Sequence, residues 1–162
     1  EIPKRDWSSD VCSSDLYFDL PDRQRQYVHN GWNLPGDIYI RDADGFFHYQ
    51  CRNDDLIISG GINIAGPEIE GVLLEHPAVG EAAVVASPDE IRGMVPKAFI
   101  VLRPGFPPTD ELKEALEQLV HTQLASYKSP RRIEFVSELP KTSTGKIRRT
   151  ELRRREFGET AV

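Results

Sequence analysis

The stretch LPKTSTGKIRR, residues 139–149, places a glycine and a lysine among small hydroxyl residues, as loops that hold phosphate often do. A Walker A loop requires G-x-x-x-x-G-K-[ST], so that backbone N–H groups wrap the phosphates and a hydroxyl binds Mg²⁺. Pro140 stands where the first glycine is required, and Ile147 stands where Ser or Thr is required. We therefore predict a mobile loop that ends in Lys146 and leads directly into a basic helix, rather than a Walker loop.

Two simpler interpretations of this stretch stay open. In the first, Lys146 is an ordinary solvated lysine, as most lysines are. In the second, the helix after it is a basic patch for nucleic acid or a membrane surface.

The composition limits the class of protein. A chain of 162 residues fits one domain, or one domain plus a fragment of another, and a hydrophobic fraction of 39% is enough for a core. The formal net charge of −6 argues against a general nucleic-acid binder, and no apolar run approaches membrane-spanning length. Cys12 and Cys51 show no metal-type spacing, which favours a reducing cytoplasm. Basic residues nevertheless gather in the last third, which predicts an anionic ligand there: Lys128, Arg131, Arg132, Lys141, Lys146, Arg148, Arg149, Arg153, Arg154 and Arg155.

The N-terminal segment DWSSDVCSSDL, residues 6–16, is rich in Ser and Asp and has neither a helical nor a strand period. It corresponds residue by residue to the translation of a widely used sequencing-adaptor end. We predict that residues 1–16 are a read artefact or a disordered tail, and that native sequence begins near Tyr17. Recovery of these codons from genomic DNA would contradict the artefact hypothesis.

The rest of the chain predicts a small α+β domain preceded by a β-hairpin. The turn Asp42-Ala43-Asp44-Gly45 joins the two hairpin strands, because glycine adopts positive φ without strain. Thr109 is a plausible N-cap for an amphipathic helix. Strands are predicted at residues 38–41, 46–51, 56–58, 62–64, 81–88, 96–105 and 131–140, and helices from Pro67, over residues 110–124 and from Lys146.

Taken together, these segments resemble the adenylate-forming superfamily, which includes acyl-CoA synthetases, peptide-synthetase adenylation domains and luciferases. The resemblance covers about residues 31–157 and rests on four motifs in order. It implies the end of a large N-terminal AMP-binding domain at residues 17–53, a mobile C-terminal lid domain at 54–158 and a tail at 159–162. The motifs are GWNLPGDIYIRDADGFFHY, CRNDDLIISGGINIAGPEIE, EHPAVGEAAVVASPD and LPKTSTGKIRR.

The resemblance implies a role for individual residues. Asp37 matches the aspartate that accepts hydrogen bonds from the ribose hydroxyls of ATP or AMP, and Arg52 matches an arginine that contacts the same ribose or a nearby phosphate. Asp54 matches the hinge about which the small domain rotates. Lys146 matches the catalytic lysine that stabilises charge on the α-phosphate. Further matches are Gly60 and Gly61 for a loop that contacts the pantetheine arm of coenzyme A, and Tyr127, Ser129 and Arg131 for its nucleotide.

Each of these residues also has a purely structural interpretation. Asp37 would cap a turn, Arg52 would form a surface ion pair with Asp54 or Asp55, and the two glycines would form a tight turn. The sequence departs from the family pattern at Pro35, where a threonine is usual, and at Cys51, where a glycine is usual.

The resemblance implies that the intact enzyme uses ATP, Mg²⁺ and coenzyme A. The phosphate loop, the acyl pocket and the Mg²⁺ ligand belong to the large domain, so we predict no metal ligands here and no ligase activity for this chain alone. The stretch DDLIISGGINIAGPEIE favours an aromatic acid of the benzoate or 2-aminobenzoate type as substrate. Alternatives are a domain that loads a carrier protein and a non-catalytic module that binds through the basic helix.

Overall fold

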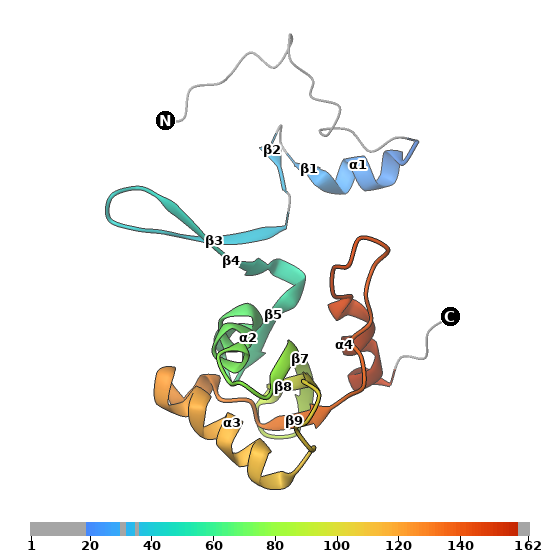
Figure 1. Ribbon diagram of the computed structural model, residues 1–162. Coiled ribbons are helices and arrows are strands. Elements are labelled where there is room, and N and C mark those ends of the chain that lie inside the picture. Colours follow the sequence, from blue (N-terminus) through green and yellow to red (C-terminus); the bar gives the residue numbers. More distant parts are fainter. Residues whose placement is uncertain (1–18, 30–31, 35, 159–162) are drawn as a thin grey trace. The chain divides into compact units, whose positions relative to one another are not determined.

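The computed structural model describes residues 19–29, 32–34 and 36–158 (Figure 1). The predicted read artefact and the C-terminal tail lie outside these residues. The chain divides into two compact units, one ending at Asp37 and the other beginning at Ile38. The predicted domain boundary at Asp54 is defined by a rotation of the small domain about this residue. It therefore stays a prediction.

The first unit is small. Helix α1 (Pro21–Tyr27) is followed by the short strands β1 (Val28–His29) and β2 (Trp32–Asn33), which pair in an antiparallel manner. The Leu34 N–H donates to the Tyr27 carbonyl oxygen at 2.7 Å and closes this segment.

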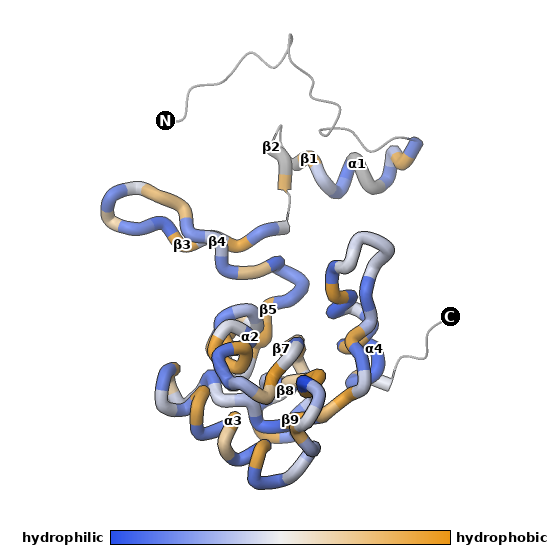
Figure 2. Tube along the Cα trace, in the orientation of Figure 1, coloured by the Kyte–Doolittle hydropathy of each residue, from blue (hydrophilic) through white to orange (hydrophobic). Residues whose placement is uncertain are grey.

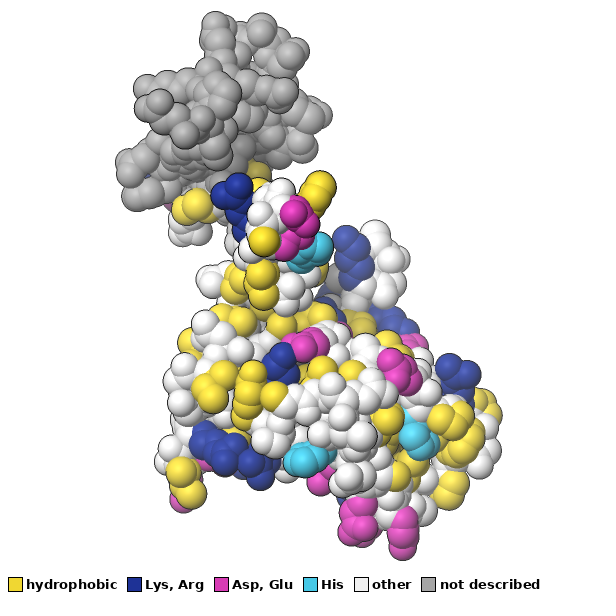
Figure 3. Space-filling view, turned by 90° about the vertical axis from the view of Figure 1, so that its left-hand side faces the viewer, with side chains coloured by type: hydrophobic (Ala, Val, Ile, Leu, Met, Phe, Trp, Pro, Cys, Tyr) yellow, Lys and Arg dark blue, Asp and Glu magenta, His cyan; other side chains and the backbone are white. Residues whose placement is uncertain are grey.

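The predicted hairpin is formed by β3 (Asp37–Arg41) and β4 (Phe47–Arg52). Its turn is built as the sequence predicts: Gly45 has φ +92°, and the Asp42 side chain accepts the Phe46 N–H at 2.8 Å. The rings of Tyr39 and Phe47 meet edge to face, yet both side chains are about half exposed or more. Figure 3 shows hydrophobic side chains exposed among charged ones on one side of the molecule.

The main sheet of the second unit has five strands around the central strand β8 (Gly93–Leu102). Strand β7 (Val79–Asp89) pairs along one edge of β8 and has no further neighbour among the strands that the structure describes. The other edge of β8 meets β5 (Leu56–Ser59) at Gly93 and, in parallel, β9 (Arg132–Phe135) at Lys97–Ile100. Strand β6 (Ile62–Ala65) pairs with β5 and ends the order β6-β5-β8-β7.

Both faces of β7 and β8 are covered, because these strands are hydrophobic on both sides, whereas Ile58 of β5 and Ile62 of β6 remain partly exposed. Ala82, Val84 and Ala86 of β7 pack with α2 (Gly66–Leu74) and α3 (Asp110–Gln123), whereas Ala83 and Val85 pack with Leu152 of α4 (Arg149–Phe157). In Figure 1 these helices lie on either side of β7, and Figure 2 shows hydrophobic residues recurring along the strands. The predicted α+β lid fold is confirmed.

Three predicted elements have a boundary that is wrong by three or more residues. The 131–140 strand is only β9, since the chain then leaves the sheet toward the loop that carries Lys146. The 96–105 strand starts earlier and ends at Leu102, just before Pro104 and Gly105. The last helix starts at Arg149 rather than Lys146, because Gly145 is left-handed at φ +82° and Ile147 forms an antiparallel bridge with Lys141. Lys146 therefore precedes the helix.

Candidate functional site

In the segment between β9 and α4, residues 141–147 form a hairpin-like turn closed by hydrogen bonds. Lys141 and Ile147 face each other across it, and the Arg148 N–H donates to the Pro140 carbonyl oxygen at 2.8 Å. The hydroxyl groups that suggested a mobile loop instead help to close it: Thr142 Oγ1 lies 2.9 Å from Thr144 Oγ1. Lys146 stands exposed in this turn, and its ammonium has no ion-pair partner within the part of the chain that the structure describes.

Both ends of the loop are fastened to the body of the domain. Lys141 Nζ lies 2.6 Å from Glu81 Oε1 of β7. Arg149, the first residue of α4, binds both oxygens of Glu70 through its Nε at 3.1 Å and a terminal nitrogen at 2.6 Å. Burial alone would lower the pKa of Arg149, but the hydrogen bonds and charge of Glu70 raise it above its usual range. Arg149 therefore stays charged and holds the end of the loop in place.

The predicted hinge lies in a short 3₁₀ turn, Asn53–Asp55, between β4 and β5. Arg52 Nε is 3.5 Å from Asp54 Oδ1, so the ion pair of the structural interpretation does form. From α4, Arg153 binds Asp55 and approaches Asp54 Oδ2 at 3.8 Å. The last helix therefore contacts the turn at which rotation is predicted.

The buried Cys51 side chain lies immediately before this turn. Burial, followed by the charges of Asp55 and Asp54, raises the pKa of its thiol. The cysteine that replaces the usual glycine is thus a neutral core residue rather than a nucleophile.

A cavity of about 650 Å³ is lined both by the predicted hinge and by the base of the lysine loop. Arg52 and Asp54 line it from one side, and Thr142, Ile147 and Arg148 line it from the other. Asp37 is the first residue of β3 and belongs to the other compact unit, so its assignment to the ribose stays a prediction.

Gly60 and Gly61 form the turn between β5 and β6, with φ values of +55° and +82°. No atom lies within 4 Å of a Cβ built on either glycine, so backbone conformation rather than crowding requires them. The Gly60 N–H donates to the Arg92 carbonyl oxygen at 3.0 Å, which joins this turn to the tip of the β7–β8 hairpin. The assignment of Gly60 and Gly61 to the pantetheine arm stays a prediction.

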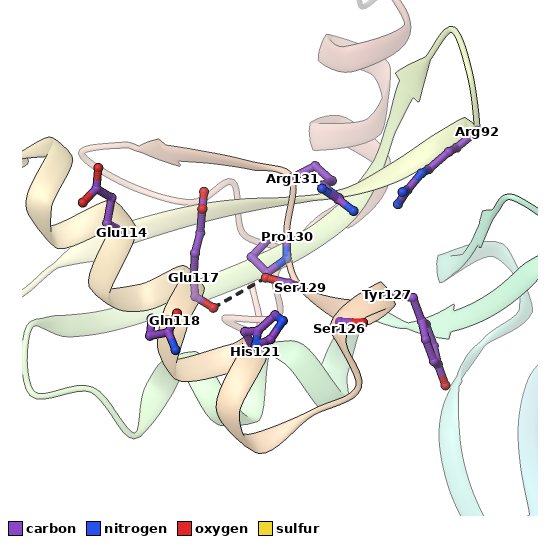
Figure 4. Close-up of a pocket in the computed structure, with 10 residues that line it drawn as sticks. All are labelled: Arg92, Glu114, Glu117, Gln118, His121, Ser126, Tyr127, Ser129, Pro130 and Arg131. Atoms are coloured by element: carbon purple, nitrogen blue, oxygen red, sulfur yellow. Dashed lines mark hydrogen bonds between the residues drawn. The ribbon is translucent and has the colours of Figure 1, made fainter.

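Tyr127, Ser129 and Arg131 do come together, in an open cavity of about 620 Å³ (Figure 4). Ser129 Oγ donates to the Glu117 carbonyl oxygen at 3.5 Å, and Arg131 is placed by its N–H bond to the Pro96 carbonyl oxygen. Arg92, which was not predicted, lines the same cavity, and Figure 4 shows its guanidinium on the same side as that of Arg131. The sequence gives little indication that Arg92 lines this cavity, because Arg92 is a single basic residue that precedes the turn residue Gly93.

No group of three or more His, Cys, Asp or Glu side chains within residues 19–29, 32–34 and 36–158 is arranged to hold a metal ion. Among the same residues, no helix is both long and apolar enough to cross a membrane.

The domain has helices on both faces of its sheet and an exposed lysine in a loop that is anchored at both ends. This is the arrangement of the C-terminal domain of adenylate-forming enzymes. Residues 68–146 match the family model described as AMP-binding enzyme C-terminal domain, and the chain belongs to this superfamily. The match ends at Lys146 itself.

Among curated proteins, the chain is 49% identical over 140 residues to an uncharacterized acyl-CoA ligase, YtcI, of Bacillus subtilis, covering 86% of this chain and 26% of that protein. It is 45% identical over 146 residues to the mitochondrial acyl-coenzyme A synthetase ACSM3 of Rattus norvegicus, covering 89% and 25%. The chain thus spans about a quarter of the length of these relatives.

Solved structures give the same result. The anthranilate CoA ligase AuaEII, in complex with anthranoyl-AMP, matches with a TM-score of 0.78 and 43% identity over 85% of this chain and 27% of that one. The o-succinylbenzoate CoA synthetase of Bacillus subtilis matches with a TM-score of 0.75 and 36% identity over 85% and 27%.

Proposed function

We propose that this chain is the mobile lid of an acid–CoA ligase. The complete enzyme joins a carboxylate to the α-phosphate of ATP, releases pyrophosphate, and then transfers the acyl group to the thiol of coenzyme A. The observation that carries the proposal is the position of Lys146, whose ammonium is exposed while the loop beneath it is fastened at both ends.

Lys146 supplies positive charge in the first half-reaction. Negative charge accumulates on the α-phosphate while the carboxylate attacks it, and a positioned ammonium stabilises that charge. A lysine carries its charge on a flexible stem, which suits a group that arrives with the lid and leaves with it. Asp37 and Arg52 contact the ribose in this proposal, and Asp54 is the residue about which the lid rotates.

The cavity in Figure 4 is proposed to receive the nucleotide end of coenzyme A in the second half-reaction. Arg92 and Arg131 offer two guanidinium groups for phosphate, and Tyr127 offers a ring beside them. Because the Gly60 N–H binds the Arg92 carbonyl oxygen, the proposed pantetheine loop and this cavity are joined through one residue.

An aromatic acid is the proposed acyl substrate. Two of the matching structures are ligases for anthranilate and o-succinylbenzoate, both aromatic acids, and the first is 43% identical to this chain. Mg²⁺, the phosphate loop and the acyl pocket are assigned to the part of the enzyme that this chain does not include. Transfer to a carrier protein, instead of coenzyme A, is the alternative within the same class.

The alternative of a basic-helix binding module has less support. Two of the arginines of α4 are engaged within the domain by partly buried carboxylates: Arg149 with Glu70 and Arg153 with Asp55. Arginines that are paired in this way contribute little to binding nucleic acid.

The proposal is tested by pyrophosphate release with a panel of carboxylates. We expect no turnover from this chain alone and turnover from the complete enzyme. In the complete enzyme, Lys146→Ala should abolish adenylate formation and largely spare transfer from preformed acyl-AMP to coenzyme A. Equal loss of both steps would contradict the role of Lys146.

Asp54→Pro tests the hinge separately. Proline fixes φ and should impair mainly the transfer step, because the lid then cannot rotate into its second pose.

Location in the cytoplasm also stays a prediction. The name of the rat relative places that protein in mitochondria.

A further inference from the structure

Thr142 contacts both backbone groups of Lys146. Its N–H donates to the Lys146 carbonyl oxygen at 2.8 Å, and its Oγ1 accepts the Lys146 N–H at 3.1 Å. In addition, the Gly145 N–H donates to the Thr142 carbonyl oxygen at 2.9 Å. One residue therefore holds the backbone of the lysine on both sides.

The hydroxyl of Thr142 is itself held in place. Its oxygen accepts the Lys146 N–H, and it shares a further hydrogen bond of 2.9 Å with Thr144 Oγ1, in which either hydroxyl can donate. The hydroxyl thus has a hydrogen-bonding role on each side, and no other side-chain oxygen in the described part of the chain accepts the Lys146 N–H.

This contact differs from the bonds that hold the rest of the loop. The loop is closed at its base by the Lys141–Ile147 bridge, by the Arg148–Pro140 bond and by the Lys141–Glu81 ion pair, none of which uses the Thr142 hydroxyl. Removal of that hydroxyl should therefore leave the loop in place and release only the backbone at its tip.

We propose that Thr142 is a positioning residue for Lys146 in adenylate formation. A fixed Cα limits the positions of the ammonium to those that the side-chain rotamers allow, and small displacements of a catalytic group reduce rates strongly. The inference rests on the proposed role of Lys146, and it assigns to the threonine a function that is distinct from binding ATP.

The test compares Thr142→Val, which removes the hydroxyl at nearly constant shape, with Thr142→Ser, which keeps it. Both are measured in the complete ligase, in separate assays of pyrophosphate release and of acyl transfer from preformed acyl-AMP. Ser143→Ala is the matched control, since Ser143 is exposed in the same loop.

We expect Thr142→Val to lower kcat for adenylate formation by about three- to tenfold, the effect of one hydrogen bond, with KM for ATP little changed. Acyl transfer by this variant should stay within about twofold of the parent, and Thr142→Ser and Ser143→Ala should do so in both assays.

Three results would overturn the inference. They are unchanged adenylation in Thr142→Val, failure of serine to restore it, and equal slowing of both half-reactions, which would indicate a general loss of structure. Lys146→Ala separates this inference from the proposed function. If Lys146→Ala abolishes adenylation while Thr142→Val does not affect it, only the positioning role is wrong. If Lys146→Ala leaves adenylation intact, the proposed function itself fails.

Discussion

The Glu70–Arg149 ion pair joins the two helical layers around the edge of strand β7, and its loss should destabilise the domain. The Glu70 side chain is 9% exposed and that of Arg149 is 23% exposed. The same carboxylate accepts the backbone N–H of Val84, a residue of β7, at 2.8 Å. Arg149→Met keeps most of the apolar stem but leaves a buried carboxylate with that single donor.

The magnitude follows from this burial. Removing one partner of a buried ion pair costs about 3–5 kcal/mol, because the remaining charge stays buried without compensation. Since Arg149 is partly exposed and water can reach its place, we expect a decrease of about 2–3 kcal/mol in the free energy of unfolding. In urea, this corresponds to a midpoint that is lower by about 1–2 M at unchanged slope.

Arg155→Met on the same helix is the control. Its partner Glu151 is 3.7 Å away, and the two side chains are 55% and 42% exposed, so we expect a change below about 0.5 kcal/mol. Equal midpoints for the two variants would refute the reasoning. A second check is Glu70→Gln combined with Arg149→Met, which should recover part of the loss, because no unpaired charge then remains.

Two further predictions concern the lysine loop and helix α3. Gly145→Ala should destabilise the loop by about 1 kcal/mol and slow adenylation, because alanine is strained at φ +82°. Crowding does not contribute, since no atom lies within 4 Å of the new Cβ. An unchanged urea midpoint together with an unchanged rate of pyrophosphate release would contradict this prediction. The hydrogen bond from Lys113 to Asp110, followed by the charge of Lys113, lowers the pKa of Asp110. Its stabilising contribution should therefore be present at neutral pH and be lost as the pH falls through the folded-state pKa. NMR titration should show the pKa of Asp110 rising toward its usual value in Lys113→Met, and no rise would exclude the pairing.

Local features of the fold were predictable from the sequence, because each depends on residues that are close neighbours in the chain. The Thr109 side chain accepts the Leu112 N–H at 3.2 Å and caps α3, as its position before the amphipathic segment predicts. Helix α3 ends at Gln123, one residue before the predicted boundary. Errors appear where local pattern and tertiary contacts disagree, as at Lys146, where the basic run suggests a helix but the bridge to Lys141 requires a turn.

The candidate site was predictable only in part. Its motifs pointed to Lys146, Arg52 and Asp54, whose roles stay predictions, and the structure brings the predicted hinge and the base of the lysine loop to one cavity. Arg92 was missed because it approaches Arg131 only through the order of the strands, with the β7–β8 hairpin tip placed beside the start of β9. The hydroxyls of the loop were recognised, but their role was misjudged, since composition alone does not show which backbone groups they bind.

The sequence by itself determined the family, the class of fold and the turns, because motif spacing, hydrophobic period and glycine conformation act over short separations. The tertiary structure alone decided how distant residues pair. Glu70 and Arg149 are 79 positions apart, and they meet because α2 and α4 pack on opposite faces of one sheet and reach around its free edge. Such a pairing depends on strand order, and strand order is fixed by the burial of the whole core rather than by any one segment.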